Sequence, residues 1–413
     1  MRRWFRRRRR TDGPVYSSVL DLGASAVKAL VVKSTDGRLE ILGRGRGVHE
    51  GGIGPDGTIG ELGVLQEACE QALVLAEDAT EGTAGHKVVP DRVVVGVPGP
   101  WLLGALGWGR VLRARLEEGV SASECNEAMA QAGRQAVRRL GRETSGGDWA
   151  LLDAVGVSFS IDGHRVTDPI GFRGHSLEAM GLVTAAPKTL LDALRKITDA
   201  LQLEPPRIIP EPVALAAAAP SDGLLVQVGA QTTGLILCRY GAPLVFGSVP
   251  WGGSSLIQAV ADARQVSHNR ALKLLHAYTE NRLDAAAKSE MEPVLTEGLL
   301  AWLSLVVERL RSWQRPVREW PTEIHVCGGT GVLPDLLQAM GTVRWMEVLN
   351  FPQTPRIRVW DGSNLAQITD HTPSKWQLDN VTTLALAAWT LNERGPETAD
   401  GMLATSLGIK EPQ

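Results

Sequence analysis

The feature that most constrains the fold is a short pattern that occurs twice, about half a chain apart. Residues 20–32, LDLGASAVKALVV, can be laid directly on residues 226–238, VQVGAQTTGLILC. Each copy places an apolar strand, a Gly-Ala turn with polar residues and a second apolar strand in the same order. Backbone N–H groups and hydroxyls in such turns can face an anion. The repeat predicts a duplicated fold that holds one phosphate chain between its two halves.

The second copy belongs to a longer stretch, residues 224–253, around which we expect the chain to be organised. This stretch predicts two apolar strands joined by a turn, followed by a second glycine turn that opens a helix. The first of these turns is made of small and polar residues that suit a phosphate loop: Gly229, Ala230, Gln231, Thr232 and Thr233.

The composition indicates the class of protein. A chain of 413 residues with 44% apolar and 22% charged residues is typical of a soluble globular protein with two or more domains. The four cysteines, Cys69, Cys125, Cys238 and Cys327, are far apart and form no C-x-x-C pair. This spacing argues against a disulfide framework or a zinc site and favours a reducing cytoplasm.

The charge is distributed unevenly along the chain. Residues 1–10, MRRWFRRRRR, carry seven arginines, and removing these from the formal net charge of −3 leaves −10 on residues 11–413. The segment lacks the apolar core of a signal peptide, and no later run approaches the roughly 20 apolar residues of a bilayer span. Arginines beside Trp4 and Phe5 predict contact with an anionic membrane surface. The alternative is a disordered tail that aids solubility or touches nucleic acid.

Two residues of the first copy carry charge toward the predicted phosphate. Asp21 ends a buried strand and can hold a hydrated magnesium ion, while Lys28 on the return strand can reach a phosphate as a point charge. The alternative is an ordinary turn aspartate with a solvated lysine.

Two later motifs can complete such a site. Glu211 stands between Pro210 and Pro212, which fix its backbone where a strand meets a helix. It can orient a water molecule for attack on a phosphate, or simply favour the helix macrodipole. Residues 328–331, Gly-Gly-Thr-Gly, start a helix and let a base or ribose lie against the backbone.

The remaining elements are expected from hydrophobic periodicity. Residues 98–181 differ in character from their surroundings and predict a small inserted α+β subdomain. We expect helices at 61–78, 123–142, 187–203, 254–264, 267–278, 287–312 and 379–391, and strands at 38–47, 92–97, 151–159, 164–168, 182–185, 207–209 and 324–327.

Taken in order, these motifs resemble the actin-like ATPase superfamily and, within it, the FtsA group of bacterial cell-division proteins. The resemblance covers nearly everything from Ser18 to Leu391. It rests on DLGASAVK, the phrase DPIGFRGHSLE at residues 168–178, PEPVALA, VGAQTTG, VPWGG and CGGTGVLP. The pilus-assembly relative PilM shares most of these motifs.

The resemblance implies a role for each motif. Asp21 would lie near Mg²⁺, Glu211 would orient the attacking water, and position 227 would belong to the catalytic set. Lys273 would approach the base or ribose of ATP. The remaining nucleotide contacts would come from Gly23, Ala24, Ser25, Lys28, Gly229, Ala230, Gln231, Thr232, Thr233, Gly328, Gly329, Thr330 and Gly331.

Three departures from the family pattern matter. Gln227 and Gly234 stand where the family's second phosphate motif has Asp, and Arg270 replaces a Glu that often precedes the adenosine-facing Lys. These changes weaken the case for hydrolysis more than the case for binding. The C-terminal segment has Lys410 as its only basic residue, unlike the family's membrane helix, so the N-terminal arginines are the better membrane candidate.

We therefore predict an α/β, two-lobed actin-like fold of duplicated ribonuclease-H-like domains. The expected divisions are 1–14 (tail), 15–97 and 182–220 (first lobe), 98–181 (inserted subdomain), 221–395 (second lobe) and 396–413 (tail). The predicted function is an ATP- and Mg²⁺-binding cytoplasmic adaptor at the inner face of the cell membrane. It would link an FtsZ-type polymer to the membrane and self-associate into filaments, with no specific nucleic acid. The alternatives are a PilM-like component of a type IV pilus or type II secretion platform, and a small-molecule kinase.

Overall fold

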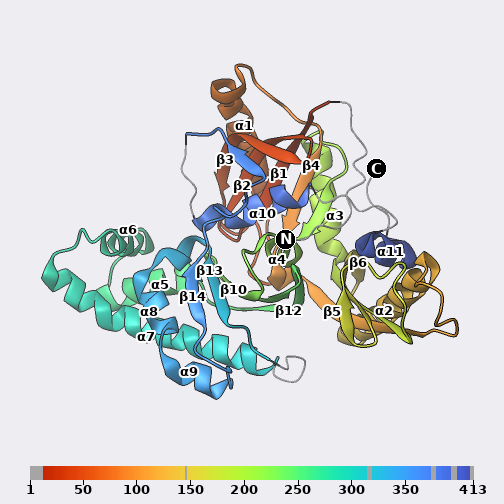
Figure 1. Cartoon of the computed structure of the whole chain (residues 1–413). Coiled ribbons are helices and arrows are strands. Elements are labelled where there is room, and N and C mark those ends of the chain that lie inside the picture. Colours follow the sequence, from red (N-terminus) through yellow and green to blue (C-terminus); the bar gives the residue numbers. More distant parts are fainter. Residues whose placement is uncertain (1–12, 145–146, 314–318, 374–377, 392–397, 410–413) are drawn as a thin grey trace.

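The computed structural model describes residues 13–144, 147–313, 319–373, 378–391 and 398–409. These residues form three sheets, one in each of two lobes and one in a subdomain beside them (Figure 1). Residues 1–10 and Lys410 lie outside the described residues, so the expectations that rest on them stay predictions. No helix in the described part of the chain is both long and apolar enough to cross a bilayer.

The first lobe is built on a six-stranded sheet in the order β15-β3-β2-β1-β4-β9. Helices α1 and α3 cover one face of this sheet. A helix can approach β3 closely because glycines alternate along it: a Cβ on Gly45 would lie 1.9 Å from the carbonyl oxygen of Ala72. The elements are β1 (Val15–Leu22), β2 (Ala26–Thr35), β3 (Arg38–Val48), α1 (Leu62–Ala84), β4 (Val93–Val97), α3 (Lys188–Ala200), β9 (Arg207–Pro210) and β15 (Ile368–Asp370).

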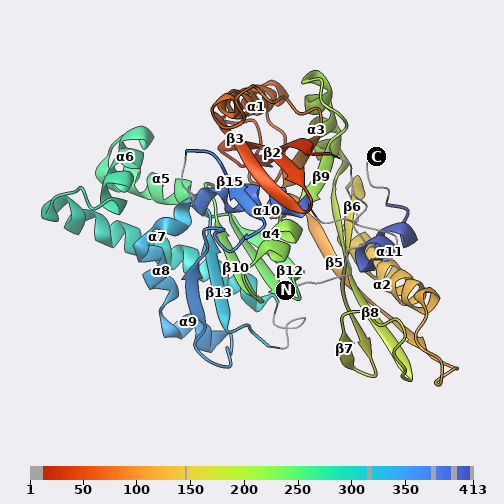
Figure 2. The same ribbon diagram turned by 45° about the horizontal axis from the view of Figure 1, so that its top comes forward.

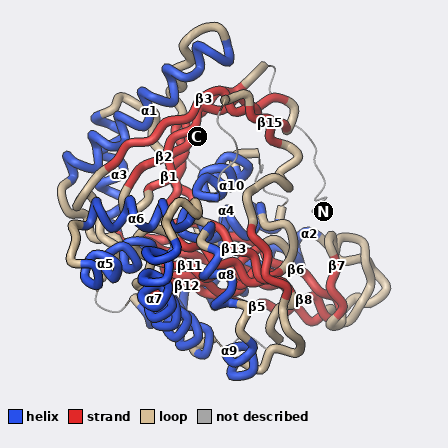
Figure 3. Tube along the Cα trace, turned by 90° about the vertical axis from the view of Figure 1, so that its left-hand side faces the viewer, coloured by secondary structure: helices blue, strands red, loops and turns tan. Residues whose placement is uncertain are grey.

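The second lobe repeats this plan with a five-stranded sheet in the order β12-β11-β10-β13-β14. Its outer face is covered by the apolar sides of α5 to α9, with α5, α6 and α7 in front of the strands in Figure 3. The elements are β10 (Gly223–Val228), β11 (Thr233–Arg239), β12 (Ala242–Val249), α5 (Gly253–Arg264), α6 (His268–Thr279), α7 (Ala285–Arg311), β13 (Glu323–Cys327), α8 (Pro334–Met340), α9 (Val343–Val348) and β14 (Arg356–Val359).

Besides a core of its own in each lobe, one cluster of buried residues is shared by both lobes. Helices α4 (Glu211–Ala218) and α10 (Val381–Trp389) lie between the two sheets and contribute apolar side chains to a cluster that includes strands of both (Figures 1 and 2). The cluster includes Val19 and Ile41 from the first sheet and Leu225 and Ile236 from the second. Residues at the N-terminal ends of α4 and α10 are thereby held between the lobes.

The predicted duplication is present in the hydrogen-bond pattern. β1 pairs antiparallel with β2 and parallel with β4, and β10 pairs antiparallel with β11 and parallel with β13. Within residues 224–253 the structure has one strand more than the two predicted, because β12 continues the meander after the turn at Tyr240 and Gly241. β14 and β15 were also not predicted.

The subdomain consists of a four-stranded antiparallel sheet and one long helix that packs on it. Its elements are β5 (Leu103–Leu112), α2 (Ala122–Glu143), β6 (Trp149–Ile161), β7 (His164–Val166) and β8 (Ser176–Pro187). A capping box between Ser121 and Glu124 begins α2. A helix that the sequence did not predict, α11 (Ala399–Ser406), packs against α2 and β6 through Met402 and Leu403.

Candidate functional site

A cavity of about 1070 Å³ lies between the lobes, with walls from both phosphate-loop hairpins, α4, α6 and the start of α10. This volume is at the upper end of the range for small-molecule sites. Most of the predicted site residues line it: Asp21, Gly23, Ala24, Ser25, Lys28, Glu211, Gln227, Gly229, Ala230, Gln231, Thr232, Gly328, Gly329 and Thr330.

The first hairpin brings two opposite charges to the cavity. Asp21 and Lys28 are cross-strand partners of β1 and β2. The buried Asp21 carboxylate accepts a hydrogen bond of 2.8 Å from the Thr383 hydroxyl on α10. The Lys28 ammonium donates to the backbone carbonyl of Asp379 and lies 3.8 Å from its carboxylate. The buried His49, which the sequence did not single out, lies with Nε2 2.9 Å from the Gly23 carbonyl oxygen and so supports the turn.

The second hairpin is neutral at the corresponding positions. Gln227 and Gly234 are cross-strand partners, and the Gln227 amide donates a 2.7 Å hydrogen bond to the Thr382 hydroxyl on α10. The turn closes on itself through a 3.0 Å bond from the Gly229 N–H to the Thr232 carbonyl. The second hairpin therefore offers backbone donors and an amide, with no carboxylate.

Thr233 was predicted to face the nucleotide, but it does not line the cavity. Its hydroxyl donates to the Trp251 carbonyl at 2.8 Å and accepts a 3.1 Å bond from the indole of Trp302. Both partners of this buried hydroxyl belong to the core of the second lobe. Thr233 therefore fixes the start of β11 and makes no wall of the cavity.

Glu211 begins α4 between its two prolines and is buried at the floor of the cavity. Its Oε1 atom has no hydrogen-bond partner in the described structure. Burial raises the pKa of Glu211 well above its usual range and the charge of Asp21 raises it further, whereas Gln227 and the charge of Lys28 act in the opposite direction. An unsatisfied carboxyl oxygen at this depth suits a bound water.

The other end of the cavity is formed by glycine turns and α6. Gly328 has φ = 92°, and a Cβ there would lie 2.4 Å from the Val228 carbonyl oxygen. The Thr330 hydroxyl donates to the Gly229 carbonyl at 3.1 Å and ties this turn to the second hairpin. The wall from α6 consists of His268, Leu272, Leu275, His276 and Thr279.

Lys273 and Gly331 are absent from the cavity wall, although both were predicted as nucleotide contacts. The Lys273 side chain is exposed. The prediction for Lys273 came from the family resemblance, and its contact with a nucleotide stays a prediction.

The sequence of this chain is similar to those of curated FtsA proteins at low identity. No family model matches. The cell division protein FtsA of Streptococcus pneumoniae is 24% identical over 344 residues, covering 77% of this chain and 71% of its own. FtsA of Bacillus subtilis is 22% identical over 346 residues, with 77% and 74% covered, and FtsA of Enterococcus hirae is 24% identical over 399 residues, with 90% and 86% covered.

Among solved structures, a chain of the PilM–PilN type IV pilus biogenesis complex superposes with a TM-score of 0.62. The match covers 92% of this chain and 99% of that one, at 16% sequence identity. The chain has the actin-like fold. Its sequence is similar to FtsA proteins over most of its length.

Within the actin-like fold, several cavity residues had no signal in the sequence. Asp379 precedes α10 and pairs with Lys28 across a separation of 351 residues. Arg46 on β3 also lines the cavity, 3.9 Å from the Asp379 carboxylate. Thr382 and Thr383 contact the two hairpins from the first turn of α10. Only the folded chain brings these positions together.

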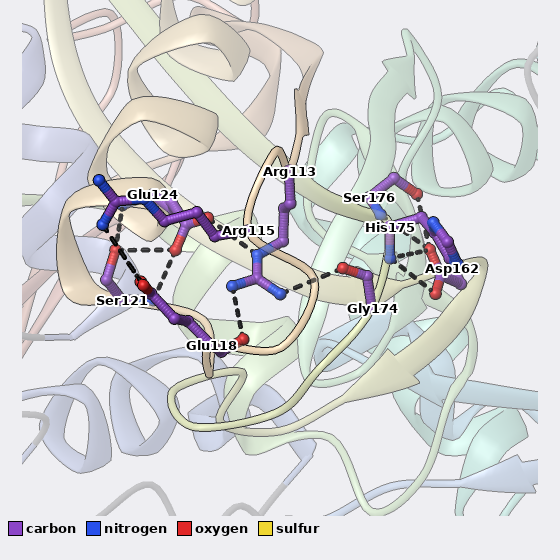
Figure 4. Close-up of polar contacts among 9 residues, drawn as sticks. All are labelled: Arg113, Arg115, Glu118, Ser121, Glu124, Asp162, Gly174, His175 and Ser176. Atoms are coloured by element: carbon purple, nitrogen blue, oxygen red, sulfur yellow. Dashed lines mark hydrogen bonds and ion pairs between the residues drawn. The ribbon is translucent and has the colours of Figure 1, made fainter.

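The FtsA-like phrase at residues 168–178 lies in the subdomain and does not line the cavity. Arg113 ties it to the loop before α2 and to the start of that helix (Figure 4), donating to Glu124 Oε1 at 2.8 Å and to the carbonyls of Gly174 at 3.1 Å and Glu118 at 2.9 Å. Backbone hydrogen bonds from His175 and Ser176 lower the pKa of Asp162, whose charge they stabilise. In this chain the phrase is therefore held by hydrogen bonds within the subdomain.

The residues present fit a magnesium nucleotide better than a resident metal ion. No group of three or more His, Cys, Asp or Glu side chains suited to a metal occurs in the part of the chain that the structure describes. Asp21 and the unsatisfied Glu211 oxygen are oxygen ligands of the kind that hydrated Mg²⁺ prefers. The glycine turns leave room for phosphates at backbone N–H groups.

Proposed function

We propose that this chain is an FtsA-like, actin-fold adaptor that binds Mg·ATP between its lobes and hydrolyses it slowly. The observation that carries the proposal is the pair of matching hairpins that face one cavity of about 1070 Å³, with Asp21 and Lys28 on one side and a glycine-rich turn on the other. Similarity to FtsA over most of the chain supports the same assignment.

Three parts of the cavity would bind the nucleotide: the two hairpins, Glu211, and the 328–330 turn with α6. Lys28 would meet a phosphate as a point charge, and the 229–232 and 23–25 turns would donate backbone N–H groups. Bound Mg²⁺ would neutralise phosphate charge beside Asp21. Glu211 would hold a water at its free oxygen, and the 328–330 turn and α6 would enclose the base and ribose.

The neutral Gln227 is the physical reason to expect slow hydrolysis. An amide is a weaker ligand for Mg²⁺ than a carboxylate, and the Gln227 amide donates to Thr382. Binding relies on Lys28 and the turns, which this change leaves intact.

As an adaptor, the protein would act on the cytoplasmic side of the cell membrane, linking an FtsZ-type polymer to it and self-associating into filaments. Residues 1–10 would supply the membrane contact, since each of seven arginines contributes about 1 kcal/mol at an anionic surface. The likeness to the PilM–PilN complex favours one alternative. There the partner would be a cytoplasmic peptide of a pilus or secretion membrane protein.

Nucleotide binding is tested by thermal unfolding with and without Mg·ATP. A ligand at about 100 times its dissociation constant stabilises the folded state by about 2.7 kcal/mol, so the melting temperature should rise clearly. Purine nucleotides at millimolar concentration that leave the melting temperature unchanged would refute the proposal.

Membrane attachment is tested by sedimentation with liposomes. The full chain should sediment with anionic liposomes, less at 1 M salt than at 0.1 M because the Debye length falls from about 10 Å to about 3 Å. A chain without residues 1–10 should stay in solution while its thermal shift with Mg·ATP persists. Sedimentation of the shortened chain would place the anchor elsewhere.

A further inference from the structure

We propose that Asp379 is a built-in counter-anion of the phosphate site, which holds Lys28 in the absence of nucleotide and must release it when a phosphate enters. The inference rests on the proposed nucleotide binding and adds its regulation: the affinity is set by competition between a side chain of the protein and the ligand. It concerns a residue that no motif in the sequence identified.

The contacts of Asp379 place it directly on the phosphate-binding lysine. The Lys28 ammonium donates to the Asp379 carbonyl and lies 3.8 Å from Oδ2 of its carboxylate. The same Oδ2 atom lies 3.9 Å from Nη1 of Arg46. Both cations are on the β2–β3 side of the cavity, and all three residues line it.

The position of Asp379 along the chain aims it at the nucleotide. It lies in the short turn Leu378–Asn380 that leads into α10, whose Thr382 and Thr383 hydrogen-bond Gln227 and Asp21. A Cβ built on Gly329 would lie 3.5 Å from the Asp379 Cβ. The carboxylate therefore stands between the first hairpin and the glycine turn, where a polyphosphate would pass.

The charged side chains around the cavity explain why Asp379 would control phosphate affinity. The acidic side chains that line it are Asp21, Glu211, Glu280, Asp361 and Asp379, whereas the lysines and arginines that line it are Lys28 and Arg46. Both of these cations lie within 4 Å of the Asp379 carboxylate. A phosphate must compete with this carboxylate for the cations, which lowers its affinity.

The geometry is also poor for a purely structural ion pair. Oδ1 of Asp379 is buried and has no hydrogen-bond partner among the described residues. Leaving a buried oxygen unsatisfied costs stability that a well-formed structural pair avoids. If the ion pair opens when a ligand binds, its carboxylate oxygens need not all be hydrogen-bonded in the ligand-free protein.

The test is calorimetric titration of the full chain with Mg·ATP, Mg·ADP and adenosine. Asp379→Asn removes the charge but keeps the backbone carbonyl that Lys28 contacts, so the fold should persist. We expect Mg·ATP and Mg·ADP to bind about tenfold more tightly, equivalent to about 1.4 kcal/mol, and adenosine affinity to stay unchanged because it carries no anion.

Two further variants separate this mechanism from a general loss of charge. Asp78→Asn removes a carboxylate on α1, outside the cavity, from its 2.6 Å pair with Lys87, and should leave all three affinities unchanged. In a Lys28→Met background, Asp379→Asn should lose most of its gain, because the carboxylate acts chiefly through Lys28. If Asp379→Asn fails to fold, Asp379→Ser provides the same comparison.

The outcomes distinguish this inference from the proposed function. Wild-type protein that binds Mg·ATP, with equal or weaker binding by Asp379→Asn, overturns the counter-anion role and leaves nucleotide binding standing. A gain that persists in full without Lys28, or that extends to adenosine, also overturns it. If no variant binds any nucleotide, the proposed function falls and this inference falls with it.

Discussion

The two phosphate-loop hairpins have the same backbone plan, but the first carries charged side chains at two positions where the second is neutral. In the first, Asp21 on β1 faces Lys28 on β2; at the matching register of the second, Gln227 on β10 faces Gly234 on β11. A pair of charged side chains on one side of the cavity thus corresponds to a glutamine and a glycine on the other.

The difference shows that the two halves of the site serve different purposes. The first hairpin supplies charge, which governs affinity for an anion over several ångströms. The second supplies shape: its turn packs against glycines, and a Cβ on Gly252 would lie 2.6 Å from the Ala230 carbonyl oxygen. Variants of the first hairpin should therefore change binding, and variants around the second should change folding.

The largest effect on stability is expected at Gly328, where the backbone of the second lobe turns after β13. After β4 the first lobe continues with Pro98, whereas after β13 the second lobe turns at Gly328 with φ = 92°. Gly328→Ala should cost about 3 kcal/mol of unfolding free energy, because its Cβ would meet the Val228 carbonyl in a left-handed conformation. Chemical denaturation measures this loss.

Gly63→Ala on α1 is the matched control, since nothing lies within 4 Å of a Cβ there. It should leave stability unchanged or raise it slightly, as alanine favours a helix. Equal effects of the two substitutions would show that the turn at Gly328 is not confined.

The next effect lies in the first hairpin. Lys28→Met should weaken Mg·ATP binding about 30-fold, or about 2 kcal/mol, because a charged hydrogen bond to phosphate is lost. Gly234→Ala, at the matching position of the second hairpin, should change affinity little, since its Cβ would need Gln227 to shift by only a few tenths of an ångström. Comparable losses in calorimetry would contradict the division between charge and shape.

The smallest effect concerns the direct link between the hairpins. The Gln231 amide donates to the Ala24 carbonyl across the cavity at 3.3 Å. Gln231→Ala should lower unfolding free energy by less than about 1 kcal/mol, as expected for one long, partly exposed hydrogen bond. Gln258→Ala, which removes an exposed bond within α5, is the control. A loss above about 2 kcal/mol would mean that this link holds the lobes together.

The sequence predicted the parts of this molecule that depend on short-range pattern. Both hairpins, the strand at 323–327 and the helix that begins after Ser121 depend on neighbours within a few residues. The structure places the second hairpin, this strand and this helix within one residue of the predicted starts, whereas the first hairpin begins earlier than predicted, at Val15. Helix α11 was missed because its eight residues span too few turns for a clear period. It is stabilised by packing, with a Cβ on Gly156 falling 2.3 Å from Ala399.

The candidate site was predicted where motifs define the backbone and missed where partners are distant. The turns that line the cavity follow from glycine and small polar residues at fixed spacing. Asp379 has no such spacing to Lys28, because the pair exists only once α10 is placed between the sheets. Lys273 is absent from the cavity wall, and its contact with a nucleotide stays a prediction, since motif order does not determine which face of α6 meets the cavity.

We infer that the second hairpin, which has Gln227 in place of a carboxylate, leaves a site that binds ATP but hydrolyses it slowly. The most direct test is phosphate release at saturating Mg·ATP by the wild type, by Gln227→Asp, and by Gln227→Asp combined with Glu211→Ala. The claim predicts slow release by the wild type, an increase of at least about tenfold in Gln227→Asp, and loss of that increase in the double variant. A wild-type rate already within the ordinary enzymatic range of about 1 s⁻¹ or more, and unaffected by Glu211→Ala, would contradict it.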